Sequence, residues 1–97
     1  MLHLIFQTVT DSSILHRIDS GDDVVFFENA LFRLNQASIL SDELQRMLKN
    51  NVNLYVLSDE LETRGINTDE LVLGIEAIDY KFFVRLTEKN QVVSSWN

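Results

Sequence analysis

Two histidines, His3 and His16, are the side chains of this sequence best suited to acid–base chemistry or to metal binding. Their spacing matches neither H-x-x-x-H nor H-E-x-x-H, the patterns that place two imidazoles on one helix face around zinc. A metal site would therefore need carboxylates brought in from elsewhere in the chain. We expect structural or surface roles for both histidines, and no metal site.

Paired carboxylates could in principle serve as a catalytic acid and base. They occur at Asp22-Asp23, Asp42-Glu43, Asp59-Glu60 and Asp69-Glu70. Each pair follows a predicted turn or opens a predicted helix, where negative charge favours the positive end of the helix dipole. An acid–base pair needs its two pKa values driven apart by burial. We interpret all four pairs as solvated loops or helix starts, and we expect no catalytic residue.

The sequence contains no cysteine, which excludes a disulfide, a thiolate zinc site, a thiol nucleophile and a persulfide on this chain. Its three glycines, Gly21, Gly65 and Gly74, are isolated, so neither G-x-G-x-x-G nor a P-loop is present. Gly21 and Gly65 follow predicted helices, where glycine suits the left-handed position after the last turn. The sequence therefore predicts no nucleotide, flavin or other cofactor.

The charge balance disfavours direct binding to nucleic acid. Fifteen acidic residues against eight Lys and Arg give a formal net charge of -7, whereas binding to phosphates depends on clustered Lys and Arg. No apolar run reaches membrane-spanning length, and the start of the sequence does not resemble a signal peptide. We expect a soluble, cytoplasmic protein that binds neither membranes nor RNA or DNA by itself.

Apolar segments alternate with amphipathic ones along the whole chain. This pattern predicts strands at 2–9, 24–27, 52–57, 75–78 and 91–93, and helices at 14–18, 30–34, 42–49, 58–64 and 80–89. A chain of 97 residues is long enough for one core only. We expect a single domain over residues 1–97, a three-layer α/β/α fold with a mostly parallel sheet of four to five strands.

The last helix carries the clearest local signals. Asp79 is a suitable N-cap, as is Ser41 for an earlier helix, and Ile78 and Phe83 have the spacing of a hydrophobic staple. Phe82, Phe83 and Leu86 form one apolar face of this helix. The same helix carries Tyr80 and Val84 on a second side, and a helix apolar on two sides is buried on both or docked against another subunit. We predict a partner interface at Tyr80 and Val84, with Trp96 as a neighbour.

Two segments resemble the TusB/DsrH family of small sulfur-relay subunits. Residues 54–65, LYVLSDELETRG, are similar to the family's Y-V-L-x-x-D-L-x-x-R-G stretch with an offset at the acidic position. Residues 78–87, IDYKFFVRLT, with Trp96 near the end, are similar to its I-D-Y-x-x-F-V-x-L-T stretch and near-terminal tryptophan. The likeness runs over nearly the full chain, and it implies a DsrEFH-like fold, flavodoxin-like in outline.

The resemblance also implies a function. TusBCD-type complexes are hexamers of two copies each of three small subunits, which pass persulfide sulfur toward 2-thiouridine at the wobble position of certain tRNAs. The sulfur-carrying cysteine belongs to the TusD-like partner. Some DsrH relatives carry a cysteine near the position of Ile14, and its absence here favours the tRNA-thiolation branch. The implied partners are TusC-like and TusD-like subunits.

The sequence therefore supports two functional hypotheses. The first is a non-catalytic structural subunit of a sulfurtransferase complex. The alternative is a stand-alone α/β domain that binds a small ligand, with His3 near its site. The missing cysteine and the missing phosphate loop favour the first hypothesis.

Overall fold

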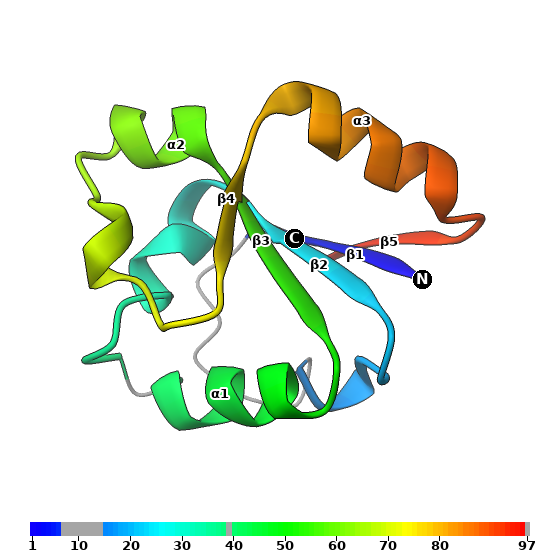
Figure 1. The fold of residues 1–97 in the computed structure, drawn as a ribbon, viewed down its shortest axis with the longest axis horizontal. Coiled ribbons are helices and arrows are strands. Elements are labelled where there is room, and N and C mark those ends of the chain that lie inside the picture. The colour runs from blue at the N-terminus through cyan, green and yellow to red at the C-terminus, as the bar shows by residue number, and fades with distance from the viewer. Residues whose placement is uncertain (7–14, 39, 97) are drawn as a thin grey trace.

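The chain folds around a five-stranded sheet in which every neighbouring pair of strands is parallel (Figure 1). The structure, a computed structural model, describes residues 1–6, 15–38 and 40–96. The strands lie in the order β4-β3-β2-β1-β5. Their bounds are β1 Leu2–Ile5, β2 Asp23–Phe26, β3 Asn53–Leu57, β4 Glu76–Ile78 and β5 Val93–Trp96. The helices are α1 Ser41–Lys49, α2 Ser58–Thr63 and α3 Tyr80–Lys89, with 3-10 helices at Leu15–Arg17, Glu28–Arg33 and Thr68–Glu70.

The first face of the sheet, on the side of α1, carries the larger core. Because side chains alternate along a strand, Ile5, Val24, Phe26, Leu54 and Val56 all point to this face. They pack with α1, α2 and the 3-10 helices through Leu15, Ala30, Leu31, Leu34, Leu44, Met47 and Leu61. All these side chains are buried, so this layer confirms the expected α/β packing.

In the described part of the chain, the second face is covered by a single connection between two strands. β4 lies at one edge of the sheet and β5 at the other, and α3 connects the two. Among the described helices, α3 alone contributes to the smaller core on this face (Figure 1). That core consists of Leu2, Val25, Phe27, Ile78 and Leu86, with half-buried residues around it.

The start of α3 is fixed as the sequence predicts. The Asp79 side-chain Oδ1 accepts a hydrogen bond from the Phe82 backbone N–H at 2.8 Å. Phe83 donates its backbone N–H to the Asp79 carbonyl at 3.1 Å. Ile78 and Phe83 both pack in the core of the second face, as a hydrophobic staple requires. The predicted cap of the last helix is therefore confirmed.

Several local predictions need correction. Ser41 does not cap α1: the helix begins at Ser41 itself, and the residue before it, Leu40, makes no side-chain cap. The Ser41 hydroxyl instead accepts a hydrogen bond from the Gln45 side chain at 3.2 Å. The helix expected at 30–34 is a 3-10 helix, Glu28–Arg33, and the one expected at 14–18 is a single 3-10 turn within its described part.

The ends of two strands also differ from the expectation. β1 ends at Ile5, and residues 7–14 of the predicted first strand and helix lie outside the described residues. β5 begins at Val93 and includes Trp96, whereas the sequence predicts a strand at 91–93. Periodicity places such short strands poorly because edge pairing with β1 decides their ends. Gly65 has a φ of +65° after α2, as expected for its position.

We expect Asp79→Ala to lower the free energy of unfolding by about 0.5–2 kcal/mol, because it removes the cap of α3. Asp79→Asn retains a side-chain oxygen that can accept the same hydrogen bond, and it should lose much less. Urea unfolding followed by circular dichroism measures both changes. Equal losses for the two variants would show that the charge of Asp79, not its cap, stabilises the protein.

Candidate functional site

The part of the second face that α3 leaves uncovered is the candidate functional surface. Burial along β1 shows where the cover ends, because Leu2 is buried while Leu4 and Phe6, on the same face, are only half-buried. On the first face the alternate residues His3 and Ile5 are both fully buried. The helix therefore covers the amino end of β1 and leaves its carboxyl end accessible on this face.

Aromatic rings continue this accessible surface from β1 onto α3. The rings of Phe6 and Phe27 stack with centroids 4.8 Å apart, and Phe83 meets Phe27 edge-on at 5.5 Å. Tyr80 lies 6.1 Å from Phe83 between centroids and is 67% exposed. We call the following residues the α3-side surface: Leu4, Phe6, Leu57, Tyr80, Phe83 and Val84.

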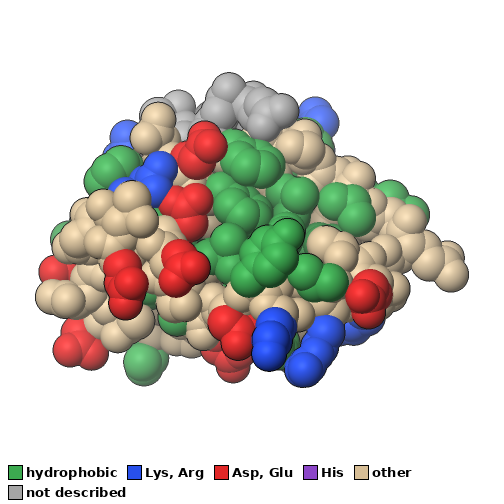
Figure 2. Space-filling model, turned by 90° about the horizontal axis from the view of Figure 1, so that it is seen from above, with side chains coloured by type: hydrophobic (Ala, Val, Ile, Leu, Met, Phe, Trp, Pro, Cys, Tyr) green, Lys and Arg blue, Asp and Glu red, His purple; other side chains and the backbone are tan. Residues whose placement is uncertain are grey.

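Figure 2 shows this side of the molecule, where hydrophobic side chains gather in the centre between charged groups. Lys81 and Arg85 are exposed on the outer side of α3, and Asp59 and Glu62 are exposed on α2. A contiguous apolar surface bordered by charges is typical of a protein–protein contact. Its members offer apolar and aromatic contact area, and Tyr80 adds a phenolic hydroxyl.

The structure brings together two of the three predicted interface residues. Tyr80 and Val84 are one turn apart on α3, and both belong to the α3-side surface. Trp96 lies in the other layer: it pairs with Ile5 and packs against the core of the first face. The sheet itself therefore separates Trp96 from Tyr80 and Val84.

The sequence prediction missed Leu4, Phe6 and Leu57 as members of this surface. Alternation assigns them correctly to one face of their strands. It does not show how far a helix from the end of the chain extends over that face. Their only sequence signal is the apolar character shared with ordinary core residues.

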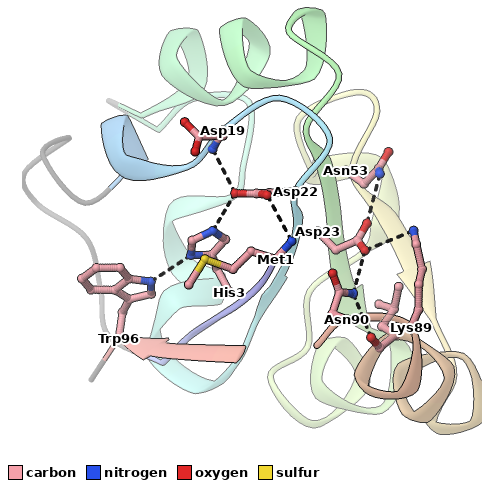
Figure 3. A network of polar contacts seen from close by, with 10 residues as sticks. Met1, His3, Asp19, Asp22, Asp23, Asn53, Lys89, Asn90 and Trp96 are labelled. Carbon is pink, nitrogen blue, oxygen red and sulfur yellow. Dashed lines mark hydrogen bonds and ion pairs between the residues drawn. The ribbon is translucent and has the colours of Figure 1, made fainter. Parts of the chain in front are cut away.

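The prediction that the Asp22-Asp23 pair is solvated is wrong. Asp22 and Asp23 are 9% and 1% exposed, and each carboxylate is held by several donors (Figure 3). Asp22 accepts from the Met1 ammonium at 3.2 Å, His3 Nε2 at 2.9 Å and the Asp19 backbone N–H at 3.0 Å. Buried carboxylates need such partners, and Met1 and His3 come from the start of the chain, which the sequence near Asp22 does not reveal.

Asp23 joins the amino ends of two strands to the end of α3. Its Oδ1 accepts from the Asn53 side chain at 3.0 Å, which links β2 to β3. Its Oδ2 accepts from the side chains of Asn90 at 3.0 Å and Lys89 at 3.3 Å (Figure 3). Asn90 also donates to the Leu86 carbonyl, so the last turn of α3 is tied to the sheet.

The structure places the two histidines in separate surroundings. His3 is 1% exposed within the network of Asp22. His16 is exposed and lies 3.0 Å from Glu43, which also pairs with Arg46. In the described part of the chain no three His, Asp or Glu side chains converge as metal ligands would.

One hollow among the described residues does not involve His3. It has a volume of about 200 Å³ and lies at the amino ends of β3 and β4, lined by Leu48, Asn51, Val52, Asn53, Leu54, Tyr55, Gly74 and Glu76. None of these side chains is a nucleophile of the kind that a sulfur carrier needs. No described helix is long and apolar enough to cross a membrane.

The parallel sheet, covered fully on one face and partly on the other, defines an α/β protein with an apolar surface at its carboxyl ends. The family model described as "DsrH like protein" matches residues 5–93, and the chain belongs to this DsrH-like family. The Protein TusB of Serratia proteamaculans is 32% identical over 87% of this chain and 84% of its own length.

Two further comparisons agree with this assignment. The Protein TusB of Buchnera aphidicola subsp. Baizongia pistaciae is 26% identical over 99% of this chain and all of its own length. A solved protein of unknown function, MTH1491 from Methanobacterium thermoautotrophicum, has a TM-score of 0.78 over 98% of this chain and 96% of that one. Its identity is 16%, so this likeness supports the fold alone.

We expect Asp22 to contribute to acid sensitivity. Burial raises its pKa, but the hydrogen bonds from Asp19, His3 and the Met1 ammonium outweigh burial and hold the pKa below 3.8. A carboxylate with a lowered pKa stabilises the fold above its ordinary pKa, and this stabilisation is lost as the pH falls through the folded value. Asp22→Asn should therefore make the free energy of unfolding vary less between about pH 5 and pH 2.

Urea unfolding at several pH values measures this dependence, with Asp69→Asn at an exposed position as the matched control. The control should follow the unmodified protein. An unchanged acid dependence in Asp22→Asn would contradict the assigned role of Asp22.

Proposed function

We propose that this chain is a non-catalytic structural subunit of a heteromeric sulfur-relay complex of the TusBCD type. In this proposal the complex passes persulfide sulfur toward 2-thiouridine at the wobble position of tRNA, in the cytoplasm. Membership in the DsrH-like family and the TusB relatives support the proposal. The observation that carries it is the α3-side surface, an apolar area that the described part of the chain leaves partly exposed.

The absence of cysteine defines what this subunit contributes. A persulfide needs a thiol to carry it, and the sequence has none. In this proposal the sulfur stays on the TusD-like partner, and this chain contributes contact surface that holds or shields the partner's site. It is thus not an enzyme alone, although it belongs to a sulfurtransferase complex.

The composition of the α3-side surface suits a permanent partner. Obligate interfaces are more apolar than ordinary surface and are enriched in aromatic residues. Tyr80 and Phe83 supply aromatic area, and Val84 supplies apolar area beside them. The proposed assembly contains two copies each of this chain, a TusC-like subunit and a TusD-like subunit.

We expect co-expression with TusC-like and TusD-like partners to yield a stable heteromer in native mass spectrometry. Tyr80→Glu or Val84→Glu should weaken the assembly about tenfold or more, because each places a charge in an apolar contact. Leu73→Glu is the matched control: Leu73 is 90% exposed but lies away from the α3-side surface, before β4. The isolated Tyr80→Glu variant should keep its unfolding free energy, because Tyr80 is 67% exposed.

Two results would contradict this part of the proposal. One is a chain that stays apart from both partners at micromolar concentration. The other is an assembly that Leu73→Glu disrupts and Tyr80→Glu leaves intact. In cells, deletion of the gene should lower thiolated tRNA, and this chain without cysteine should restore it, whereas Tyr80→Glu should restore less.

We also expect the isolated chain not to bind tRNA, because its net charge of -7 repels the phosphate backbone. Filter-binding titration at low salt measures this. Binding below micromolar concentration that weakens as salt is added would contradict the prediction and would place tRNA contact on this subunit.

A further inference from the structure

His3 is a fully buried imidazole with both of its ring nitrogens engaged (Figure 3). Trp96 Nε1 lies 3.2 Å from His3 Nδ1, and Asp22 Oδ2 lies 2.9 Å from His3 Nε2. An indole N–H can only donate, so Nδ1 must accept and carry no proton. The proton of the neutral ring therefore sits on Nε2 and is donated to Asp22.

This arrangement holds for the neutral imidazole only. Protonation would place a second N–H on Nδ1, directly against the indole N–H of Trp96, and two donors repel. Trp96 would then lose its only side-chain acceptor among the described residues. The hydrogen bond between His3 and Trp96 thus depends on the protonation state of one ring nitrogen.

Among the described residues, the charged groups around His3 come from three parts of the chain. Asp22, before β2, attracts an imidazolium, and the Met1 ammonium, 3.2 Å from Asp22, opposes it. Arg17, on the first 3-10 helix, lies over the Trp96 ring with its guanidinium carbon 5.8 Å from the ring centroid. β5 brings no charged side chain, since its sequence is Val-Ser-Ser-Trp.

Trp96 is also the last residue of β5, and its hydrogen bond to His3 fastens the end of this strand. β5 lies at the edge of the sheet and pairs with β1 alone. Beyond the indole, its end is secured by the Phe6 backbone N–H, which donates to the Trp96 carbonyl at 3.1 Å. A short edge strand with few bonds is the part of a sheet that opens most readily.

We propose that the His3–Trp96 hydrogen bond makes the end of β5 a pH-sensitive element. As the pH falls and His3 becomes protonated, Trp96 leaves His3 and the carboxyl end of β5 separates from β1. The edge of β1 is then exposed for pairing at its carboxyl end. The rest of the sheet stays folded, because Trp96 is only partly buried where it packs against the core of the first face.

The single tryptophan of the sequence provides a direct readout. Nuclear magnetic resonance on the ¹⁵N-labelled full chain reports the indole N–H of Trp96, the ring nitrogens of His3 and the amides of β5. As the pH is lowered and the His3 ring takes up a second proton, we expect the indole N–H to lose its hydrogen-bonded shift in step with His3. Amides of β5 should lose exchange protection while those of α3 keep theirs.

His16→Gln is the matched control, because it removes the other histidine and should leave the transition unchanged. His3→Gln should abolish the transition. If that variant does not fold, the ¹⁵N shifts of the His3 ring nitrogens in the unmodified chain test the proposal. They must show a proton on Nε2 and none on Nδ1 at neutral pH.

Three results would overturn the proposal. They are a proton on Nδ1 at neutral pH, an indole signal that does not follow His3, and loss of protection in α3 together with β5. The last would show unfolding of the whole chain rather than local opening.

Discussion

The buried carboxylate of Asp23 fixes where α3 lies, and the rest of the second face depends on it. Asp23 holds Asn53 of β3 and both Lys89 and Asn90 at the end of α3. At the other end of the helix Asp79 caps the first turn. A helix secured at both ends crosses the sheet along one line from β4 to β5. The path of α3 therefore determines which part of the second face is covered and which part is left accessible.

The uncovered part of the second face is apolar because the strands of a parallel sheet carry apolar side chains on both faces. In parallel sheets both faces are normally covered, and their strands are apolar throughout. Here a single described helix covers the second face, so Leu4, Phe6 and Leu57 remain half-buried at the carboxyl ends of their strands. Apolar side chains that remain partly exposed in this way are unfavourable in water and favour association. The chain has no thiol that could carry a persulfide, so in the proposed complex its contribution is this contact.

The sequence predicted elements whose signals are local. The cap at Asp79, the apolar side of α3 and the buried strands β2 and β3 follow from residue types and spacing, and the structure confirms them. The burial of Asp22 and Asp23 could not be predicted, because all their side-chain partners except the nearby Asp19 backbone N–H lie 19 to 67 residues away in sequence. The position of Trp96 on the first face depends on the register of β5 against β1, which periodicity does not specify.

Hydroxyl-radical footprinting of Tyr80 tests the central claim most directly, namely that the α3-side surface is covered by the partner subunits. Tyr80 is 67% exposed in the isolated chain, and Phe32, which lies on a 3-10 helix of the first face, is 53% exposed and serves as an internal control. In the complex with TusC-like and TusD-like subunits, oxidation of Tyr80 should fall to a small fraction of its value in the isolated chain, while oxidation of Phe32 stays unchanged. Equal oxidation of Tyr80 in the isolated chain and in the complex would contradict the account.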